Sequence, residues 1–260
     1  MSGPMNELAS LNIEGPVATV TINRPEQRNA MSIEMLEGLH ACIDRLEEEP
    51  GVVVTVITGA GRAFCAGMDL KQVIIDEGSG GSGEPMLPKR LLASLARLTV
   101  KIRCLSSVVV AKVNGAAIGG GCGLACVCDL VVTHADAKLG FPEVDLGLCP
   151  AVVAPWLVRK IGGGPARAVL LQGGVMSGTR AHEIGIADVV SPTRDDLDAA
   201  TDEVVHRYTE AGPEALAATK SLLNDLDRSR DLDLVLRGAE LSAAVLATEA
   251  AQANLIARLK

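Results

Sequence analysis

Two segments of the sequence each end a run of β-prone residues in a glycine-rich loop that leads into a helix start. Residues 52–59 and 108–115 are similar strands, and the loops after them read GAGRAFCAGMDL and GAAIGGGCGLA. The first turn of a helix carries backbone N–H groups without intrahelical acceptors, at the positive end of the helix dipole. Two such turns brought together would hold an oxyanion. The structural alternative is a repeated strand–turn–helix unit that stacks on itself.

Other reactive patterns in the chain do not form recognised sites. The seven cysteines are an odd number and form no CxxC pair, which favours reduced, buried thiols and no metal site. Glycines 78, 80 and 83 match G-x-G-x-x-G, but no strand precedes them and Glu84-Pro85 follows, so dinucleotide binding is rejected. The four histidines are scattered and receive no chemical role; they are residues 40, 134, 182 and 206.

The elements that must position the two loops follow from hydrophobic patterning. Short β-prone runs at 11–14 and 17–22 around Gly15-Pro16 predict a hairpin, and Ser32 is a candidate N-cap for a helix. Continuous apolar runs at 52–58 and 108–114 predict strands buried on both faces, with a further strand at 130–133. Helical spacing predicts helices over 195–208, 213–226 and 232–259. We therefore expect an α/β core over 1–194 and a helical region over 195–260.

Composition and net charge argue against several classes of binding partner. The chain has 260 residues, of which 48% are hydrophobic, so we expect a self-sufficient core. With 24 basic and 32 acidic residues the net charge is −8, and no basic cluster interleaves with aromatic residues, so we expect no nucleic-acid partner. The charge-free stretch 113–128 is too short and too rich in glycine to span a membrane. Residues 1–8 lack an export signal, and we expect a cytoplasmic protein.

Five segments resemble the crotonase family, also called the enoyl-CoA hydratase/isomerase superfamily. They keep the order of the family's motifs over roughly the first 190 residues. The segments are INRPEQRNAMS (22–32), FCAGMDL (64–70), VNGAAIGGGCGLACVCDL (113–130), FPEVDLGLCP (141–150) and GTRAHEIGIADVV (178–190). The resemblance implies a spiral of repeated ββα units followed by a C-terminal α-helical trimerisation region.

The same resemblance implies a site for a coenzyme A thioester. Its carbonyl would lie in an oxyanion hole made by the backbone N–H groups of Met68 and Gly120. Because enolising a thioester places charge on the carbonyl oxygen, aligned N–H donors stabilise that charge. Coenzyme A is part of the substrate, so no separate cofactor and no metal is expected. The family also implies a homo-oligomer, a trimer or a dimer of trimers.

Family hydratases use two glutamates, and this chain matches one of them. Glu143 in Phe141-Pro142-Glu143 fits the second, where it would act as the general base or proton shuttle. Its structural alternative is a solvated loop residue. Gly123 stands at the position of the first glutamate, which puts two-glutamate hydration in doubt or makes space for a branched acyl chain. Ala151 replaces an aspartate that a dienoyl-CoA isomerase would carry, which argues against that branch.

A polyanionic coenzyme A needs local positive charge on an acidic protein. Arg24, Arg28 and Lys71 are the candidate basic residues, although a solvated surface charge is an equal alternative for each. By analogy with the family, Ala66 and its neighbours Asp69 and Leu70 are candidates for further substrate contacts.

The resemblance to the crotonase family leaves three functions open. The leading hypothesis is an enoyl-CoA hydratase-like lyase that uses the backbone oxyanion hole and Glu143 on a 2-enoyl-CoA, in fatty acid metabolism. The first alternative is a Δ3,Δ2-enoyl-CoA isomerase, for which one glutamate suffices. The second is an acyl-CoA-binding pseudoenzyme that keeps the pocket without efficient chemistry.

Overall fold

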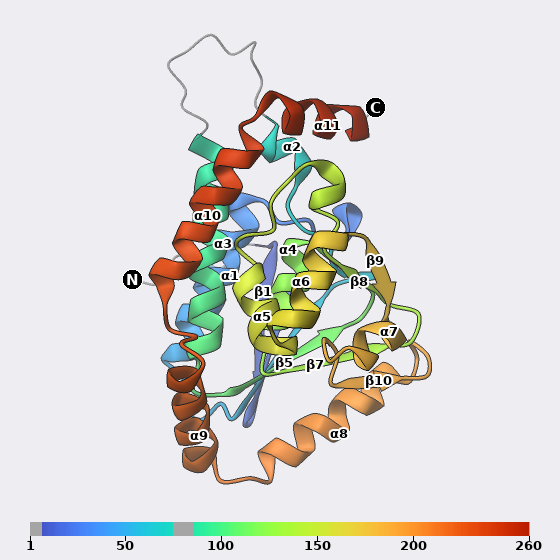
Figure 1. The fold of residues 1–260 in the computed structure, drawn as a ribbon. Coiled ribbons are helices and arrows are strands. Elements are labelled where there is room, and N and C mark those ends of the chain that lie inside the picture. Colours follow the sequence, from blue (N-terminus) through green and yellow to red (C-terminus); the bar gives the residue numbers. More distant parts are fainter. Residues whose placement is uncertain (1–6, 75–85, 260) are drawn as a thin grey trace.

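The computed structural model describes residues 7–74 and 86–259, which form two sheets with helices around them (Figure 1). The glycine-rich segment at 76–85 lies outside the described residues. The larger sheet has the strand order β1-β2-β3-β5-β7-β10, with bounds Ala9–Glu14, Val17–Ile22, Val54–Gly59, Val108–Val113, Leu130–His134 and Val189–Ser191. The smaller sheet has the order β4-β6-β8-β9, with bounds Ala63–Cys65, Ala116–Ile118, Lys138–Gly140 and Val175–Ser177.

The predicted hairpin and buried strands are confirmed. β1 pairs antiparallel with β2, and β2, β3, β5, β7 and β10 then run parallel to one another. Alternate residues of β5 pack on opposite faces: Val108 and Val110 join one apolar cluster, and Val109 and Ala111 join the main core. A strand covered on both faces has no position for a polar alternation, which explains its continuous apolar run.

Long and short strands alternate along the chain in a repeated unit. β3 is followed by β4, β5 by β6, and β7 by β8; the first of each pair joins the large sheet and the second joins the small one. A helix follows each of the first two pairs. The repeat therefore brings the segments after β4, β6 and β8 to one region of the molecule, as the expected ββα spiral requires.

The helices surround both sheets (Figure 1). Ser32 caps the first of them by accepting a hydrogen bond from the Met35 N–H, as its sequence position predicted. The helices are α1 (Ile33–Glu47), α2 (Leu70–Val73), α3 (Met86–Cys104), α4 (Gly120–Val127), α5 (Ala154–Ile161), α6 (Gly163–Gln172), α7 (Gly178–Glu183), α8 (Leu197–Thr209), α9 (Pro213–Leu226), α10 (Leu232–Leu246) and α11 (Glu249–Leu259), with 3-10 turns η1 (Pro25–Gln27) and η2 (Val144–Leu146).

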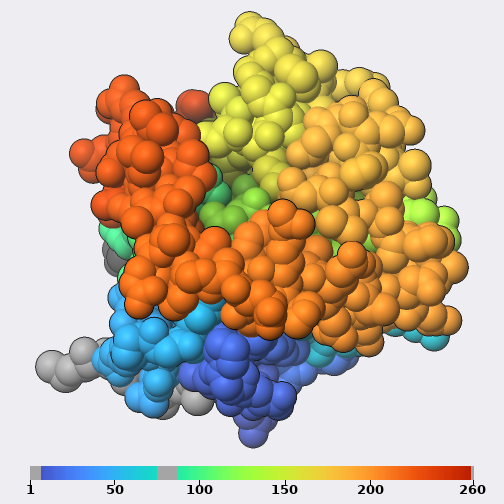
Figure 2. Space-filling view, turned by 90° about the horizontal axis from the view of Figure 1, so that it is seen from below, coloured from blue at the N-terminus to red at the C-terminus, as the bar shows by residue number. Residues whose placement is uncertain are grey.

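The region that follows β10 is helical, but its last predicted helix is divided. The prediction of one helix over 232–259 is wrong because α10 ends at Leu246 and Thr248 starts α11 by accepting a hydrogen bond from the Ala251 N–H. Leu197 of α8 packs on the outer apolar face of the large sheet. Figure 2 shows α8 and α9 (orange) lying across this side of the molecule. The domain boundary at 194/195 stays a prediction. Within the described residues, no helix is both long and apolar enough to cross a bilayer.

Candidate active site

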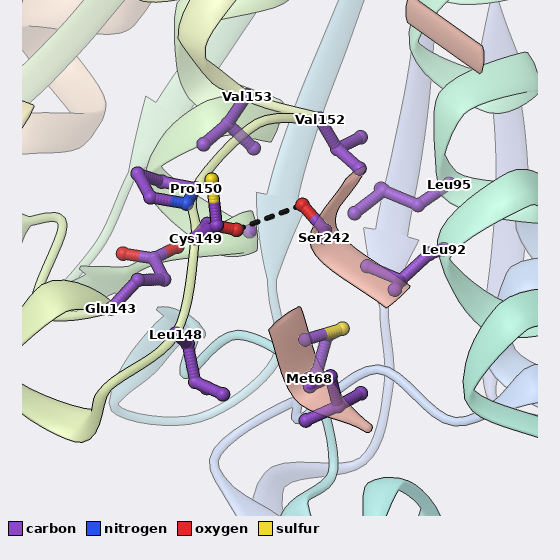
Figure 3. A pocket seen from close by; sticks show the side chains of 12 residues that line it. Met68, Leu92, Leu95, Glu143, Leu148, Cys149, Pro150, Val152, Val153 and Ser242 are labelled. Carbon is purple, nitrogen blue, oxygen red and sulfur yellow. Dashed lines mark hydrogen bonds between the residues drawn. The ribbon is translucent and has the colours of Figure 1, made fainter. Parts of the chain in front are cut away.

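An apolar pocket lies where α3, α4 and α10 meet the loop that precedes α5 (Figure 3). Glu143, Cys149 and Pro150 stand on one side of it, and Leu92 and Leu95 of α3 stand on the other. Three of the predicted site residues, Met68, Gly120 and Glu143, line this one pocket. The complete lining is Met68, Leu92, Leu95, Gly120, Glu143, Leu148, Cys149, Pro150, Val152, Val153, Ser242 and Leu246.

The backbone around Met68 is held beside Met31 in a way that directs one N–H group away from the Met31 segment. Met31 donates its N–H to the Gly67 carbonyl at 2.7 Å and accepts from the Asp69 N–H at 2.9 Å. Since successive peptide groups of an extended chain alternate in direction, the Met68 N–H points to the opposite side. Among the described residues it has no hydrogen-bond acceptor.

The Gly120 N–H has a different origin, because it belongs to the first turn of α4. Gly119 precedes it with φ of +54°, a left-handed conformation that favours glycine. No described residue accepts a hydrogen bond from Gly120, as is usual at a helix start. A Cβ atom built on Gly67 would lie 2.8 Å from the Ile118 carbonyl oxygen and 3.8 Å from the Gly120 nitrogen. The absence of a side chain at Gly67 therefore lets the two donor loops approach each other.

Glu143 follows β8 and precedes η2, and its carboxylate lies beside the start of α4. A Cβ atom built on Gly119 would lie 2.9 Å from the Glu143 Oε1. The buried Oε2 atom has no hydrogen-bond partner within the described part of the chain. Burial raises the pKa of Glu143 to about 7, partly opposed by a backbone hydrogen bond. The structure thus places this glutamate in an apolar pocket rather than on a solvated loop.

The position of Gly123 is closed by Val153. A Cβ atom built on Gly123 would lie 2.1 Å from Val153 Cγ1 and 2.5 Å from Val153 Cβ. Both residues are buried. The expectation that Gly123 makes space for a branched acyl chain is therefore wrong, since the valine side chain already fills that space. Within the described lining, Glu143 is the one acidic side chain of the pocket.

The predicted substrate-binding residues lie together, but two of them are paired with each other. Arg24 Nη1 lies 2.7 Å from Asp69 Oδ2, and Asp69 also caps α2 by accepting from the Lys71 N–H. The side chains of Arg28 and Lys71 are exposed. The Ala66 N–H donates to the Arg28 carbonyl at 3.0 Å. Exposed charge for a polyanion is thus available from Arg28 and Lys71 rather than from Arg24.

The half-buried Leu70 packs against the main apolar core. Its side chain therefore supports the α2 segment that carries Lys71 and follows the Met68 donor loop.

Several pocket residues could not be found from the sequence. Ser242 of α10 donates to the Cys149 carbonyl at 2.8 Å and accepts from the Ala151 N–H at 3.2 Å. A Cβ atom built on Gly238, one turn earlier, would lie 2.4 Å from the Ala151 carbonyl oxygen. Helix α10 therefore clamps the loop that forms one wall of the pocket. No local pattern relates these residues, because about ninety positions separate them.

Comparison with known proteins agrees with the fold. The model of the family Enoyl-CoA hydratase/isomerase matches residues 12–251. A Thermus thermophilus protein provisionally named an enoyl-CoA hydratase is 37% identical over 210 residues, which is 81% of each chain. The solved structure of Pseudomonas aeruginosa AtuE is 35% identical, with a TM-score of 0.77, over 84% of this chain and 83% of that one.

An enoyl-CoA hydratase from Mycobacterium avium is 29% identical, with a TM-score of 0.84, over 98% of this chain and 97% of that chain. The architecture is thus the crotonase fold, as the sequence motifs indicated. The chain belongs to the enoyl-CoA hydratase/isomerase family.

Proposed function

We propose that this chain is an enoyl-CoA hydratase-like lyase, which adds water to a 2-enoyl-CoA thioester or removes it from the hydrated product. The thioester carbonyl binds between the N–H groups of Met68 and Gly120, and Glu143 transfers protons at the neighbouring carbon. The observation that carries the proposal is the Glu143 carboxyl, whose buried Oε2 has no hydrogen-bond partner among the described residues and which lines the same pocket as Met68 and Gly120. The names of the relatives in the preceding section support the same class.

The chemistry needs charge stabilisation at one end and proton transfer at the other. When water attacks C3 of the enoyl group, negative charge moves through C2 to the carbonyl oxygen. A preorganised N–H donor in such a site contributes roughly 3 kcal/mol to the stabilisation of that charge. The Glu143 pKa of about 7 lets the side chain exchange protons in both directions near neutral pH.

One carboxylate can complete the atom balance of hydration. Ionised Glu143 removes a proton from water, the resulting hydroxyl bonds to C3, and the glutamate then returns the proton to C2. No other proton donor is required. The apolar lining from Leu92, Leu95 and Val152 excludes competing water from the acyl chain.

A Δ3,Δ2-enoyl-CoA isomerase is the second candidate, and the Val153 side chain over Gly123 favours it. In isomerisation Glu143 removes a proton from C2 of a 3-enoyl thioester and returns it to C4, with no water in the reaction. A pocket with a single carboxylate and an apolar remainder suits this transfer.

The remaining parts of the proposal concern coenzyme A and assembly. The exposed side chains of Arg28 and Lys71 are proposed to bind the phosphates of coenzyme A, and no cofactor beyond the substrate is invoked.

A homo-oligomer is proposed because leucines on α9 and α10 are exposed, among them Leu222, Leu226 and Leu241. A trimer or a dimer of trimers, a role in fatty acid metabolism and a cytoplasmic location stay predictions.

The test is to incubate the protein with a 2-enoyl-CoA and a 3-enoyl-CoA and to identify the products by chromatography and mass. A 3-hydroxyacyl product from the 2-enoyl substrate supports the lyase. Conversion of the 3-enoyl to the 2-enoyl substrate without alcohol supports the isomerase. Binding without turnover of either substrate leaves the acyl-CoA-binding pseudoenzyme.

Two variants relate the products to the site. Glu143→Gln should abolish turnover, and the matched variant Glu37→Gln on the exposed face of α1 should keep it. Full activity of Glu143→Gln would contradict the mechanism.

A further inference from the structure

The loop that presents the Met68 N–H is bound along its length by the short segment 28–31. The Ala66 N–H donates to the Arg28 carbonyl at 3.0 Å, the Met31 N–H donates to the Gly67 carbonyl at 2.7 Å, and the Asp69 N–H donates to the Met31 carbonyl at 2.9 Å. The direction of the Met68 N–H therefore depends on where segment 28–31 lies.

Asn29 lies at the centre of this segment and is fully buried. Its Nδ2 donates to the Ala60 carbonyl at 3.0 Å and to the Ala63 carbonyl at 2.8 Å, and its Oδ1 accepts from the Arg24 N–H at 2.8 Å. These bonds use both donors and one acceptor site of the carboxamide. The side chain thus connects segment 28–31 to both ends of the turn before β4, the strand that leads into Met68.

Two backbone features are specific to this contact. Asn29 has φ of +58°, a left-handed conformation that asparagine adopts more readily than most residues. A Cβ atom built on Gly59 would lie 2.7 Å from the Asn29 Nδ2. The glycine at position 59 therefore leaves room for the carboxamide to reach the turn.

The same segment is tied to the far side of Met68 by an ion pair. Arg24 Nη1 donates to the Ala30 carbonyl at 3.2 Å and to Asp69 Oδ2 at 2.7 Å. Asp69 directly follows Met68 and caps α2. Met68 is therefore bracketed by the Asn29 contacts on the β4 side and by the Arg24–Asp69 pair on the α2 side.

We propose that Asn29 is a positioning residue for the oxyanion hole, acting through segment 28–31 to aim the Met68 N–H at the thioester carbonyl. This inference rests on the proposed function. Asn29 does not line the pocket, so it does not touch the substrate and is not a catalytic residue. Loss of its two donated hydrogen bonds loosens the turn before β4 and reduces the alignment of the Met68 N–H, without changing Glu143.

Asn29→Asp is the test variant, because it keeps the shape and the acceptor but removes both donors. Misplacing a catalytic group by about 1 Å costs up to about 10²-fold in rate, so we expect kcat to fall at least about tenfold with little change in KM. The carbonyl stretching frequency of a bound 2-enoyl-CoA, measured by infrared difference spectroscopy, should shift back toward its value in water. A thioether analogue without the carbonyl should bind as tightly as it binds the wild type.

Asn224→Asp is the matched control. Asn224 is also buried, and its Nδ2 donates to the Arg103 carbonyl at 3.0 Å, but it belongs to α9 and does not line the pocket. This variant should lose stability without changing the bound carbonyl frequency. If Asn29→Asp does not fold, Asn29→Gly, which accepts the left-handed backbone, replaces it with the same expectation.

The outcomes separate the inference from the function on which it rests. An unshifted carbonyl frequency in the wild-type complex would refute the oxyanion hole itself. A shifted frequency that Asn29→Asp leaves unchanged, with an unchanged kcat, would overturn the positioning role of Asn29 alone. Equal changes in Asn29→Asp and Asn224→Asp would show a general loss of folding and would also overturn it.

Discussion

Glu143→Gln should make the protein more stable at alkaline pH while it removes activity. The Glu143 carboxyl has a pKa of about 7 in the folded chain, compared with an ordinary value of 4.5, because burial disfavours the ionised form. This pKa difference corresponds to about 3 kcal/mol in the free energy of unfolding, since one pKa unit is worth about 1.4 kcal/mol. Glutamine keeps the shape of the protonated acid and carries no charge to desolvate.

The direction in which the free energy of unfolding changes with pH follows from the raised pKa of Glu143. The neutral carboxyl is stable in its apolar pocket below about pH 4.5, where folded and unfolded chains are both protonated. As the pH rises from about 4.5 to about 7, this carboxyl ionises in the unfolded chain but stays protonated in the folded one, so the free energy of unfolding of the wild type falls by about 3 kcal/mol from this group and levels off at higher pH. The variant has no such group, so the stability difference between the two proteins should grow over this range.

Urea unfolding of both proteins, at one protein concentration and at several pH values from about 4.5 to about 8.5, measures this difference. Glu37→Gln, in which an exposed carboxylate of α1 is replaced, should show no comparable pH-dependent gain. A stability difference between Glu143→Gln and wild type that does not change with pH would refute the reasoning. So would a variant that becomes less stable than wild type at the alkaline end.

Three further results are expected. In wild type, kcat/KM should fall as the pH drops below about 7, because protonated Glu143 cannot act as a base; a flat profile from steady-state rates would contradict this role. Gly123→Ala should lower the free energy of unfolding, measured in urea, by about 1–3 kcal/mol through overlap with Val153. Val153→Ala in the same chain should recover part of this loss, and strictly additive effects would exclude the overlap. Ser242→Ala should lower the free energy of unfolding by about 1–2 kcal/mol, because it leaves the Ala151 N–H without its acceptor. It should also raise KM for long acyl chains, and an unchanged KM would show that the loop keeps its position without the Ser242 hydrogen bonds.

The long strands were predictable from sequence, and the short ones were not. The apolar runs at 52–58 and 108–114 correspond to β3 and β5, because burial on both faces leaves a continuous hydrophobic pattern. β4, β6, β8 and β9 have three residues each, too few to show a period of two. The small sheet that carries the donor loops therefore became visible only in three dimensions.

Some residues of the candidate site could be predicted from the sequence, and others could not. Met68, Gly120 and Glu143 follow from motifs that are local in the chain, and the structure brings all three to one pocket. The Val153 contact with Gly123 depends on packing between α4 and the start of α5, which no local pattern encodes.

Arg24 and Asp69 were predicted as substrate-binding residues, but in the structure they bind each other. Each has the residue type expected for polar substrate contacts, but their ion pair is visible only from the distance between their side chains.

The most direct test of Glu143 as the proton-transfer group is deuterium incorporation at C2 of the acyl chain. Wild-type protein with a 2-enoyl-CoA in D₂O should give a 3-hydroxyacyl-CoA with deuterium at C2, as read by NMR, since the proton returned by Glu143 comes from solvent. Glu143→Gln should give no labelled product, and Glu37→Gln should label as the wild type does. Labelling by Glu143→Gln at the wild-type rate would contradict the account.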